Sequence, residues 1–208
     1  MRKRMRREMV FLGALTVAVL AAVIPGYSQD GASLKESFRN IQSVKAEFVQ
    51  ERHLQILKDP LVSEGRFFYL ASGSLRWEYF SPLRSVMLQK GNNIQVYNFS
   101  EGKWKPEMIQ AVEARRMVLA EISRWFQGRF DESKAFKHTY SPGPPARIIL
   151  VPGEGINRFI QRIEIVLSVR PGVIDRVEIE ESGGSRTFIE FRNVVINSSI
   201  SSEVFEKP

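Results

Sequence analysis

The fold is decided by residues 63–99, which read SEGRFFYLASGSLRWEYFSPLRSVMLQKGNNIQVYNF. Apolar side chains recur at every second position, at Phe67 and Tyr69 and again at Leu75, Trp77 and Tyr79. This spacing places side chains on one face of a β-strand. Turns rich in glycine, serine and asparagine, with one proline, separate the runs at intervals typical of hairpins. The stretch therefore predicts four consecutive strands of an antiparallel meander.

The meander carries more large aromatic side chains than one face of a thin sheet needs. The second apolar surface must therefore face something, and two arrangements fit the pattern. One is the packed core of a sandwich or barrel, and the other is a cavity for an apolar ligand. Periodicity does not distinguish between them.

The chain before and after the meander is predicted to complete its sheet. Leu34, Phe38 and Ile41 share one face of a short amphipathic helix. A strand pattern then runs from Val44 through Ile56. Strand patterns resume at residue 136 and continue to residue 196. The total is about ten or eleven antiparallel strands.

A helical pattern interrupts the strands between residues 108 and 126. A helix inserted between antiparallel strands lays its apolar stripe on a face of the sheet, so we expect it to form a lid that plugs or covers a half-open barrel. The predicted lid stripe consists of Ile109, Val112, Leu119, Ile122, Trp125 and Phe126.

Residues 1–28 are typical of a secretory signal peptide. Five basic residues precede an apolar run from Met9 to Ile24, and Gly26-Tyr27-Ser28 offers a small-x-small cleavage site. An uncleaved anchor is the alternative, but sixteen apolar residues fall short of the roughly twenty that span a bilayer. The leader carries +4 of the net charge of +7, so residues 29–208 form a weakly basic single domain without the basic clusters of a nucleic-acid-binding protein.

Residue types that carry catalysis are sparse. The chain has no cysteine, which excludes disulfides, thiol catalysis and a lipidated cysteine. His53 and His138 are the only histidines, and neither lies in a pattern of metal ligands or a catalytic triad. A nucleophile elbow and a phosphate-binding loop are both missing from the sequence. We therefore expect a binding protein without metal or cofactor, and not an enzyme.

An ordered set of motifs resembles the LolA family of periplasmic lipoprotein carriers. The motifs are Phe48-Val49-Gln50, Gly65 leading into Phe67 and Tyr69, Leu75-Arg76-Trp77-Glu78-Tyr79, Pro82, Lys90-Gly91 before Val96-Tyr97, and the closing Val204-Phe205 with Pro208. The resemblance covers most of residues 29–208 and is strongest from Val44 to Phe99.

The resemblance implies a half-open antiparallel β-barrel under a helical lid. It implies a periplasmic monomer that receives acyl chains of lipoproteins from an inner-membrane release complex and passes them to an outer-membrane acceptor. One departure concerns the family's Arg-Pro pair, whose arginine holds the lid closed, because Ala71 and Ser72 stand at that spacing. Arg76 and Arg84 are candidate substitutes. A carrier of another acylated or polyene-type lipid, or a lipid-sensing module, is the alternative function.

We expect the lid side chains to fill part of an apolar cavity until a lipid displaces them. The predicted wall depends on strand parity, because a slip of one residue exchanges the two faces of a strand. Its residues are Phe48, Phe67, Tyr69, Leu75, Trp77, Val86, Leu88 and Val96.

Overall fold

A computed structural model describes residues 31–107 and 121–208 of the chain. Within those residues, eleven strands form one antiparallel sheet in the order β6-β5-β4-β3-β2-β1-β11-β10-β9-β8-β7. The strands are β1 (Ser43–His53), β2 (Leu61–Leu70), β3 (Ser74–Ser81), β4 (Ser85–Lys90), β5 (Asn93–Ser100), β6 (Lys103–Pro106), β7 (Phe136–Ser141), β8 (Arg147–Pro152), β9 (Ile160–Leu167), β10 (Ile174–Glu181) and β11 (Arg186–Ile196). The helices are α1 (Gly31–Arg39), a helical segment at residues 121–126, and the 3₁₀ turn η1 (Ser202–Phe205).

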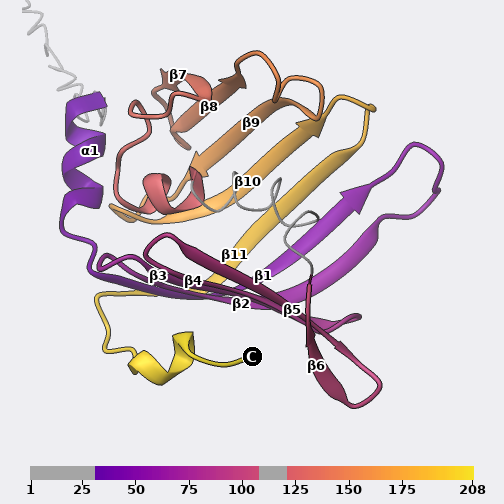
Figure 1. Ribbon diagram of the computed structural model, residues 1–208. Helices are drawn as coiled ribbons and strands as arrows, with labels where there is room; N and C mark the ends of the chain where they lie inside the picture. The colour runs from indigo at the N-terminus through magenta and orange to yellow at the C-terminus, as the bar shows by residue number, and fades with distance from the viewer. Residues whose placement is uncertain (1–30, 108–120) are drawn as a thin grey trace, which may run out of the picture.

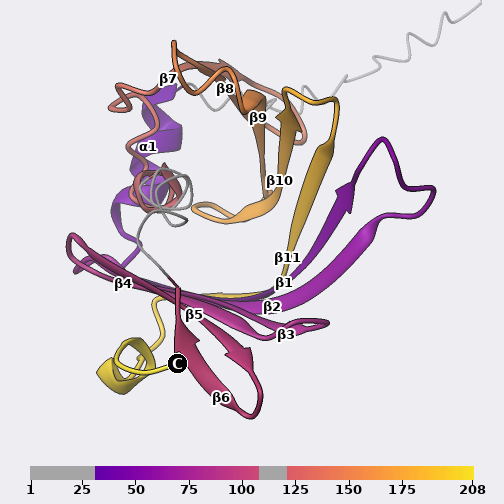
Figure 2. The same ribbon diagram turned by 45° about the vertical axis from the view of Figure 1, so that its right-hand side comes forward.

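The sheet is strongly curved, so that its two arms face each other (Figures 1 and 2). One arm consists of β2 to β6, the other of β7 to β10, and the paired strands β1 and β11 join them. The helical segment at 121–126 lies between the arms, on the concave face. The structure therefore confirms the predicted half-open antiparallel barrel covered by a helix.

Strand register assembles the concave face from the periodic apolar positions. Phe67 pairs with Trp77, which pairs with Met87, and Tyr69 pairs with Leu75. Directly paired residues point to the same side of a sheet. The alternation read from residues 63–99 thus becomes one continuous apolar surface, as the meander predicted.

Helix α1 closes one end of the half-barrel. Phe38 is buried and packs edge-to-face on Phe130, with ring centroids 5.3 Å apart. A Cβ on Gly128 would lie 2.8 Å from the Cβ of Phe38, and the φ of Gly128 is +67°. Both the close approach and the left-handed backbone require glycine there.

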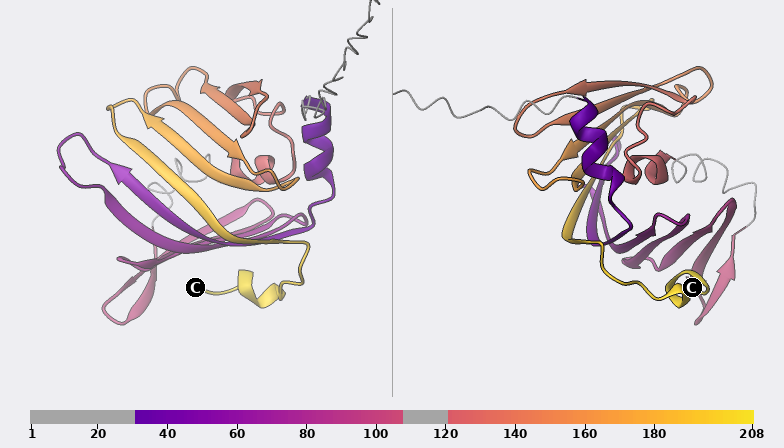
Figure 3. Two further views of the ribbon diagram at one scale, coloured as in Figure 1. Left: turned by 180° about the vertical axis from the view of Figure 1, so that it is seen from behind. Right: turned by 90° about the vertical axis from the view of Figure 1, so that its left-hand side faces the viewer.

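The C-terminal residues cover part of the outer face of the sheet, over β3 and β4. Figure 3 shows η1 on the side of the sheet away from α1. The guanidinium of Arg76 donates to the carbonyl oxygens of Val204, at 3.1 Å, and Lys207, at 2.7 Å. Phe205 is buried against this face.

The first strand is shorter than predicted. β1 ends at His53, and Ile56, which the pattern placed in the strand, is 89% exposed in the connection to β2. Leu54 and Ile56 continue the apolar alternation into the loop, so the pattern alone overestimates the length of the strand. No helix among residues 31–107 and 121–208 has the length and apolar character needed to cross a bilayer.

Candidate ligand-binding site

A cavity of about 510 Å³ lies between the two arms of the sheet. Its volume falls within the roughly 300–1,000 Å³ typical of small-molecule sites. Its apolar lining comes from both arms and from the helical segment, and consists of Trp77, Tyr79, Met87, Ile122, Trp125, Phe136, Ile156, Phe159, Ile160, Ile163, Ile179 and Ile189. Its polar lining consists of Gln50, Arg52, Glu121, Glu181 and Thr187.

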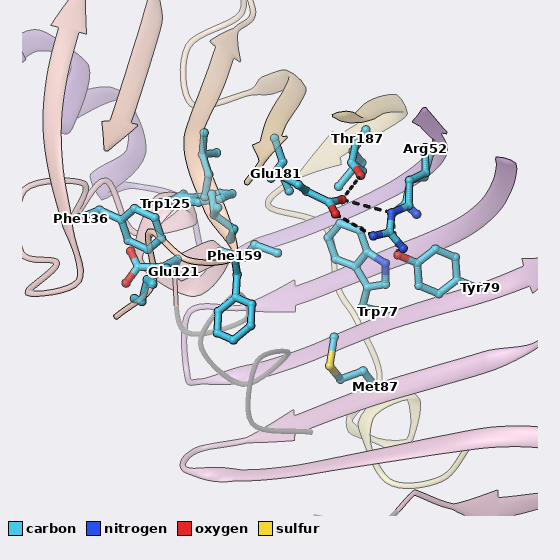
Figure 4. Close-up of a pocket in the computed structure, with 17 residues that line it drawn as sticks. Arg52, Trp77, Tyr79, Met87, Glu121, Trp125, Phe136, Phe159, Glu181 and Thr187 are labelled. Atoms are coloured by element: carbon cyan, nitrogen blue, oxygen red, sulfur yellow. Dashed lines mark hydrogen bonds and ion pairs between the residues drawn. The ribbon is translucent and has the colours of Figure 1, made fainter. Parts of the chain in front are cut away.

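The polar side chains separate into two groups (Figure 4). Arg52, Glu181 and Thr187 lie together near Tyr79, whereas Glu121 lies beside Trp125 and Phe136 at the other side of the cavity. The wall between the two groups is apolar. The cavity therefore suits a ligand with a long apolar portion.

The Arg52 group joins three adjacent strands. Nε and Nη2 of Arg52 on β1 donate to the two carboxylate oxygens of Glu181 on β10, at 3.1 and 2.7 Å. Thr187 on β11, the strand between them, donates its hydroxyl to Glu181 at 3.1 Å. The side chain of Arg52 is 45% exposed and that of Glu181 25%, so solvent reaches this end of the cavity.

The residues 121–126, which we call the lid segment, pack into the concave face. The ring of Phe126 stacks on Phe67 and Tyr69, with centroids 4.8 and 5.6 Å apart. Trp125 is 2% exposed. Burial raises the pKa of the Tyr69 phenol, an effect that Gln127 and Arg129 partly offset.

A second void of about 20 Å³ lies beneath the lid segment. Five residues line both this void and the large cavity: Ile122 and Trp125 of the lid segment, and Trp77, Ile179 and Ile189 of the sheet. The two spaces are therefore adjacent, and lid side chains form part of the boundary that they share.

Hydrogen bonds hold the first half of the lid segment. The buried Glu121 accepts hydrogen bonds from Arg124 and, at 2.8 Å, from the hydroxyl of Ser133. Ser123 donates to Gln89 on β4 at 3.3 Å. The segment is thus fastened to the loop after it and to one arm of the sheet.

The candidate substitutes for the family's lid arginine make their contacts on the outer face. Arg76 binds the C-terminal carbonyls described above. The guanidinium of Arg84 lies 4.2 Å from the ring centroid of Phe99 and 5.2 Å from that of Trp104. Both contacts are on the side of the sheet opposite the lid segment.

The structure places the predicted wall residues in three different surroundings. Trp77 lines the large cavity. Phe48, Phe67, Tyr69 and Leu75 lie on the concave face but within the buried core. The others are on β4 and β5.

Val86, Leu88 and Val96 are buried without lining the cavity. Val86 pairs with Glu78 and Leu88 with Arg76, so both point to the outer face. Val96 pairs with Met87 and shares its concave side. The parity of β4 is therefore opposite to the one expected, because Met87 and not its neighbours continues the row from Trp77.

Of the predicted lid residues, Ile122, Trp125 and Phe126 contact the cavity or the void beneath it. Ile109, Val112 and Leu119 lie outside the described residues. Among residues 31–107 and 121–208, no group of three His, Asp or Glu side chains is placed to hold a metal ion.

The wall of the cavity opposite Trp77 is formed by residues that were not predicted from the sequence. It comes from β9 to β11 and the loop before β9, and includes Ile160, Ile163, Ile179 and Ile189. The alternation of Ile163, Ile165 and Leu167 was a usable signal for a one-sided apolar strand. Nothing local in the sequence showed that this strand would face β3.

A curved antiparallel sheet that encloses an apolar cavity under a helical segment defines a protein of the lipid-binding class. The family described as outer membrane lipoprotein carrier protein LolA matches residues 39–207. The chain belongs to this family, as the motif resemblance predicted.

The chain is also similar to curated proteins and to solved structures. Outer-membrane lipoprotein carrier proteins of two Coxiella burnetii strains, RSA 331 and CbuK_Q154, are 22% and 21% identical over 206 residues, which covers 95% of this chain and 92% of theirs. The crystal structure of a DUF1329 family protein from Desulfovibrio piger has a TM-score of 0.50 at 11% identity, covering 86% of this chain and 95% of that one. A LolA superfamily protein from Nitrosomonas europaea has a TM-score of 0.45 at 8% identity, covering 85% and 97%.

Proposed function

We propose that the protein is a periplasmic carrier that shelters lipoprotein acyl chains and moves them from the inner to the outer membrane. The cavity of about 510 Å³ between the arms of the sheet carries this proposal. Membership of a carrier family supports it and favours binding over enzymatic activity. A leader at residues 1–28 would export the chain, and a release complex and an acceptor in the two membranes would be its partners.

Binding and release must be balanced in such a carrier. Burying one methylene contributes roughly 0.8 kcal/mol, so a chain of about fourteen methylenes would gain about 11 kcal/mol from transfer alone. A carrier that held a chain this tightly would release it too slowly. Lid side chains that occupy the site without cargo reduce the net gain, because their own burial is lost when the lipid enters.

The aromatic contacts of the lid segment fit this role. Phe126 covers Phe67 and Tyr69, and Trp125 lines both the large cavity and the smaller void. Displacing both rings would enlarge the enclosed space while exposing apolar surface that the acyl chain then covers. Lipid binding and lid opening would thus be coupled.

Native mass spectrometry of protein purified from the periplasm without detergent tests the proposal. We expect adducts whose masses correspond to acylated molecules, and extraction should recover their acyl chains. Ile179→Asp places a carboxylate in the cavity wall and should abolish the adducts. Glu178→Gln alters the preceding residue of the same strand, which lies on the outer face, and should leave the adducts unchanged. Adduct-free protein that also fails to take up added lipoprotein would refute the proposal.

A further inference from the structure

At the solvent-accessible end of the cavity, the hydrogen-bond acceptors have partners within the part of the chain that the structure describes, whereas several donors do not. A guanidinium has five N–H donors, and the hydrogen bonds of Arg52 within the described chain use two of them, both to Glu181. Both oxygens of Glu181 are occupied, one by Arg52 and the other by Arg52 and Thr187. The ion pair therefore presents spare donors and an engaged acceptor.

The neighbouring amide has the same bias. The side-chain oxygen of Gln50 accepts the hydroxyl of Tyr79 at 2.8 Å. The amide nitrogen of Gln50 has no hydrogen-bond partner among residues 31–107 and 121–208, and Gln50 lines the cavity with Arg52. This end of the cavity is thus rich in donors and poor in free acceptors.

Resting on the carrier function proposed above, we infer that Arg52 and Gln50 form a head-group subsite for a hydrogen-bond acceptor at the top of an acyl chain. The acceptor is the oxygen of an ester, an amide or a carboxylate. The hydrocarbon then extends along the apolar wall toward Trp125 and Phe136. An acceptor-free hydrocarbon or polyene would leave these donors without a partner once it excluded water, which is costly.

Glu181 competes with the ligand in this subsite. Its carboxylate holds the guanidinium of Arg52 in place but also neutralises it. Replacing this carboxylate by an amide of the same shape should therefore strengthen the binding of an anionic head group.

Displacement of a fluorescent apolar probe by three ligands with the same C12 chain length tests the inference. The ligands are laurate and dodecyltrimethylammonium, used below their micellar concentrations, and methyl laurate, used below its solubility limit. We expect laurate and methyl laurate to bind more tightly than the cation, laurate by on the order of tenfold, the worth of a hydrogen bond to a charged group. If only laurate binds tightly, the subsite is assigned to free fatty acids. If laurate and methyl laurate both bind tightly, the subsite also accepts acyl esters.

Three variants locate the effect. Glu181→Gln should raise the affinity for laurate several-fold, and Arg52→Met should remove the preference for acyl ligands. The double variant Arg52→Met/Glu181→Gln, which leaves no unpaired charge, should also lack the preference. Glu178→Gln is the matched control, because the Arg176–Glu178 pair has side-chain exposures of 46% and 28% on the outer face, close to those of the Arg52–Glu181 pair.

The outcomes separate this inference from the carrier proposal. Equal affinity for all three ligands, or a preference that survives in the double variant with circular dichroism unchanged, would overturn the subsite and leave the carrier intact. If the Arg52–Glu181 pair only ties β1 to β10, the variants will lower the unfolding temperature without altering ligand preference, and the inference is wrong. Failure of every ligand to displace the probe would refute both.

Discussion

The ring of Phe48 lies across Gly65, where a side chain on the neighbouring strand would otherwise stand. A Cβ on Gly65 would be 2.2 Å from Cζ of Phe48 and 2.2 Å from the carbonyl oxygen of Glu78. The vacant space lets the Phe48 ring reach Trp77 at 4.6 Å and Tyr79 at 5.2 Å. Phe48 thereby packs against two side chains of the cavity wall.

Gly65→Ala should therefore destabilise the protein by about 1–3 kcal/mol, the range for overpacking a filled core. Urea unfolding followed by tryptophan fluorescence measures this change. Gly183→Ala is the control, because an added Cβ at Gly183 would meet nothing within 4 Å. Equal stability of the two variants would contradict the packing described for Phe48.

Phe126→Ala should cost about 3–5 kcal/mol of stability, as is usual for truncating a buried phenylalanine. The same change empties a position on the concave face, so it should also increase the amount of lipid retained per molecule after purification. Phe159→Ala is the comparison, since Phe159 lines the cavity but is 52% exposed. A loss of stability at Phe126 no larger than that at Phe159 would argue against a packed lid.

Glu78 should make stability depend on pH. Burial by itself raises the pKa of Glu78, but Arg76 and Arg66 more than offset this, so the pKa lies below its ordinary 4.5. The carboxylate therefore stabilises the fold above the unfolded value, and this contribution is lost as the pH falls through the folded value.

Glu78→Gln should accordingly lower the free energy of unfolding by about 2 kcal/mol at pH 7, the worth of hydrogen bonds to a charged group. The difference in the free energy of unfolding between this variant and the unmodified protein should become smaller as the pH is lowered below 4.5. Urea titrations at several pH values measure it. A difference that stays constant with pH would show that the ion pair does not stabilise the fold.

Arg76→Met should release the C-terminal residues from the outer face, because it removes both hydrogen bonds to the carbonyls of Val204 and Lys207. Amide hydrogen exchange of residues 202–208 should become faster. Arg66→Met is the matched control, since Arg66 binds the same Glu78 carboxylate at 3.1 Å but is half-exposed and, within the described residues, donates no hydrogen bond to residues 202–208. Equal exchange in the two variants would show that the tail is held by other contacts.

Much of the fold was accessible from local sequence patterns. The alternation at Phe67, Tyr69, Leu75 and Trp77 predicted strands correctly, and their pairing follows from short hairpins that fix the register. The parity of β4 was not accessible, because Val86, Met87 and Leu88 are all apolar and alternation is then absent. In that case the pairing of Met87 with Trp77 decides which side chains face inward.

The sequence by itself determined the strand periodicity, the helical interruption and the family, because these depend on residues close together in the chain or on ordered motifs. Only the tertiary structure decided which side chains face one another across the cavity. The Arg52–Glu181 pair is separated by 129 positions, and Trp77 meets Ile189 in the lining although their strands are not neighbours. The physical reason is that sheet curvature brings distant strands together, and no local period records the curvature.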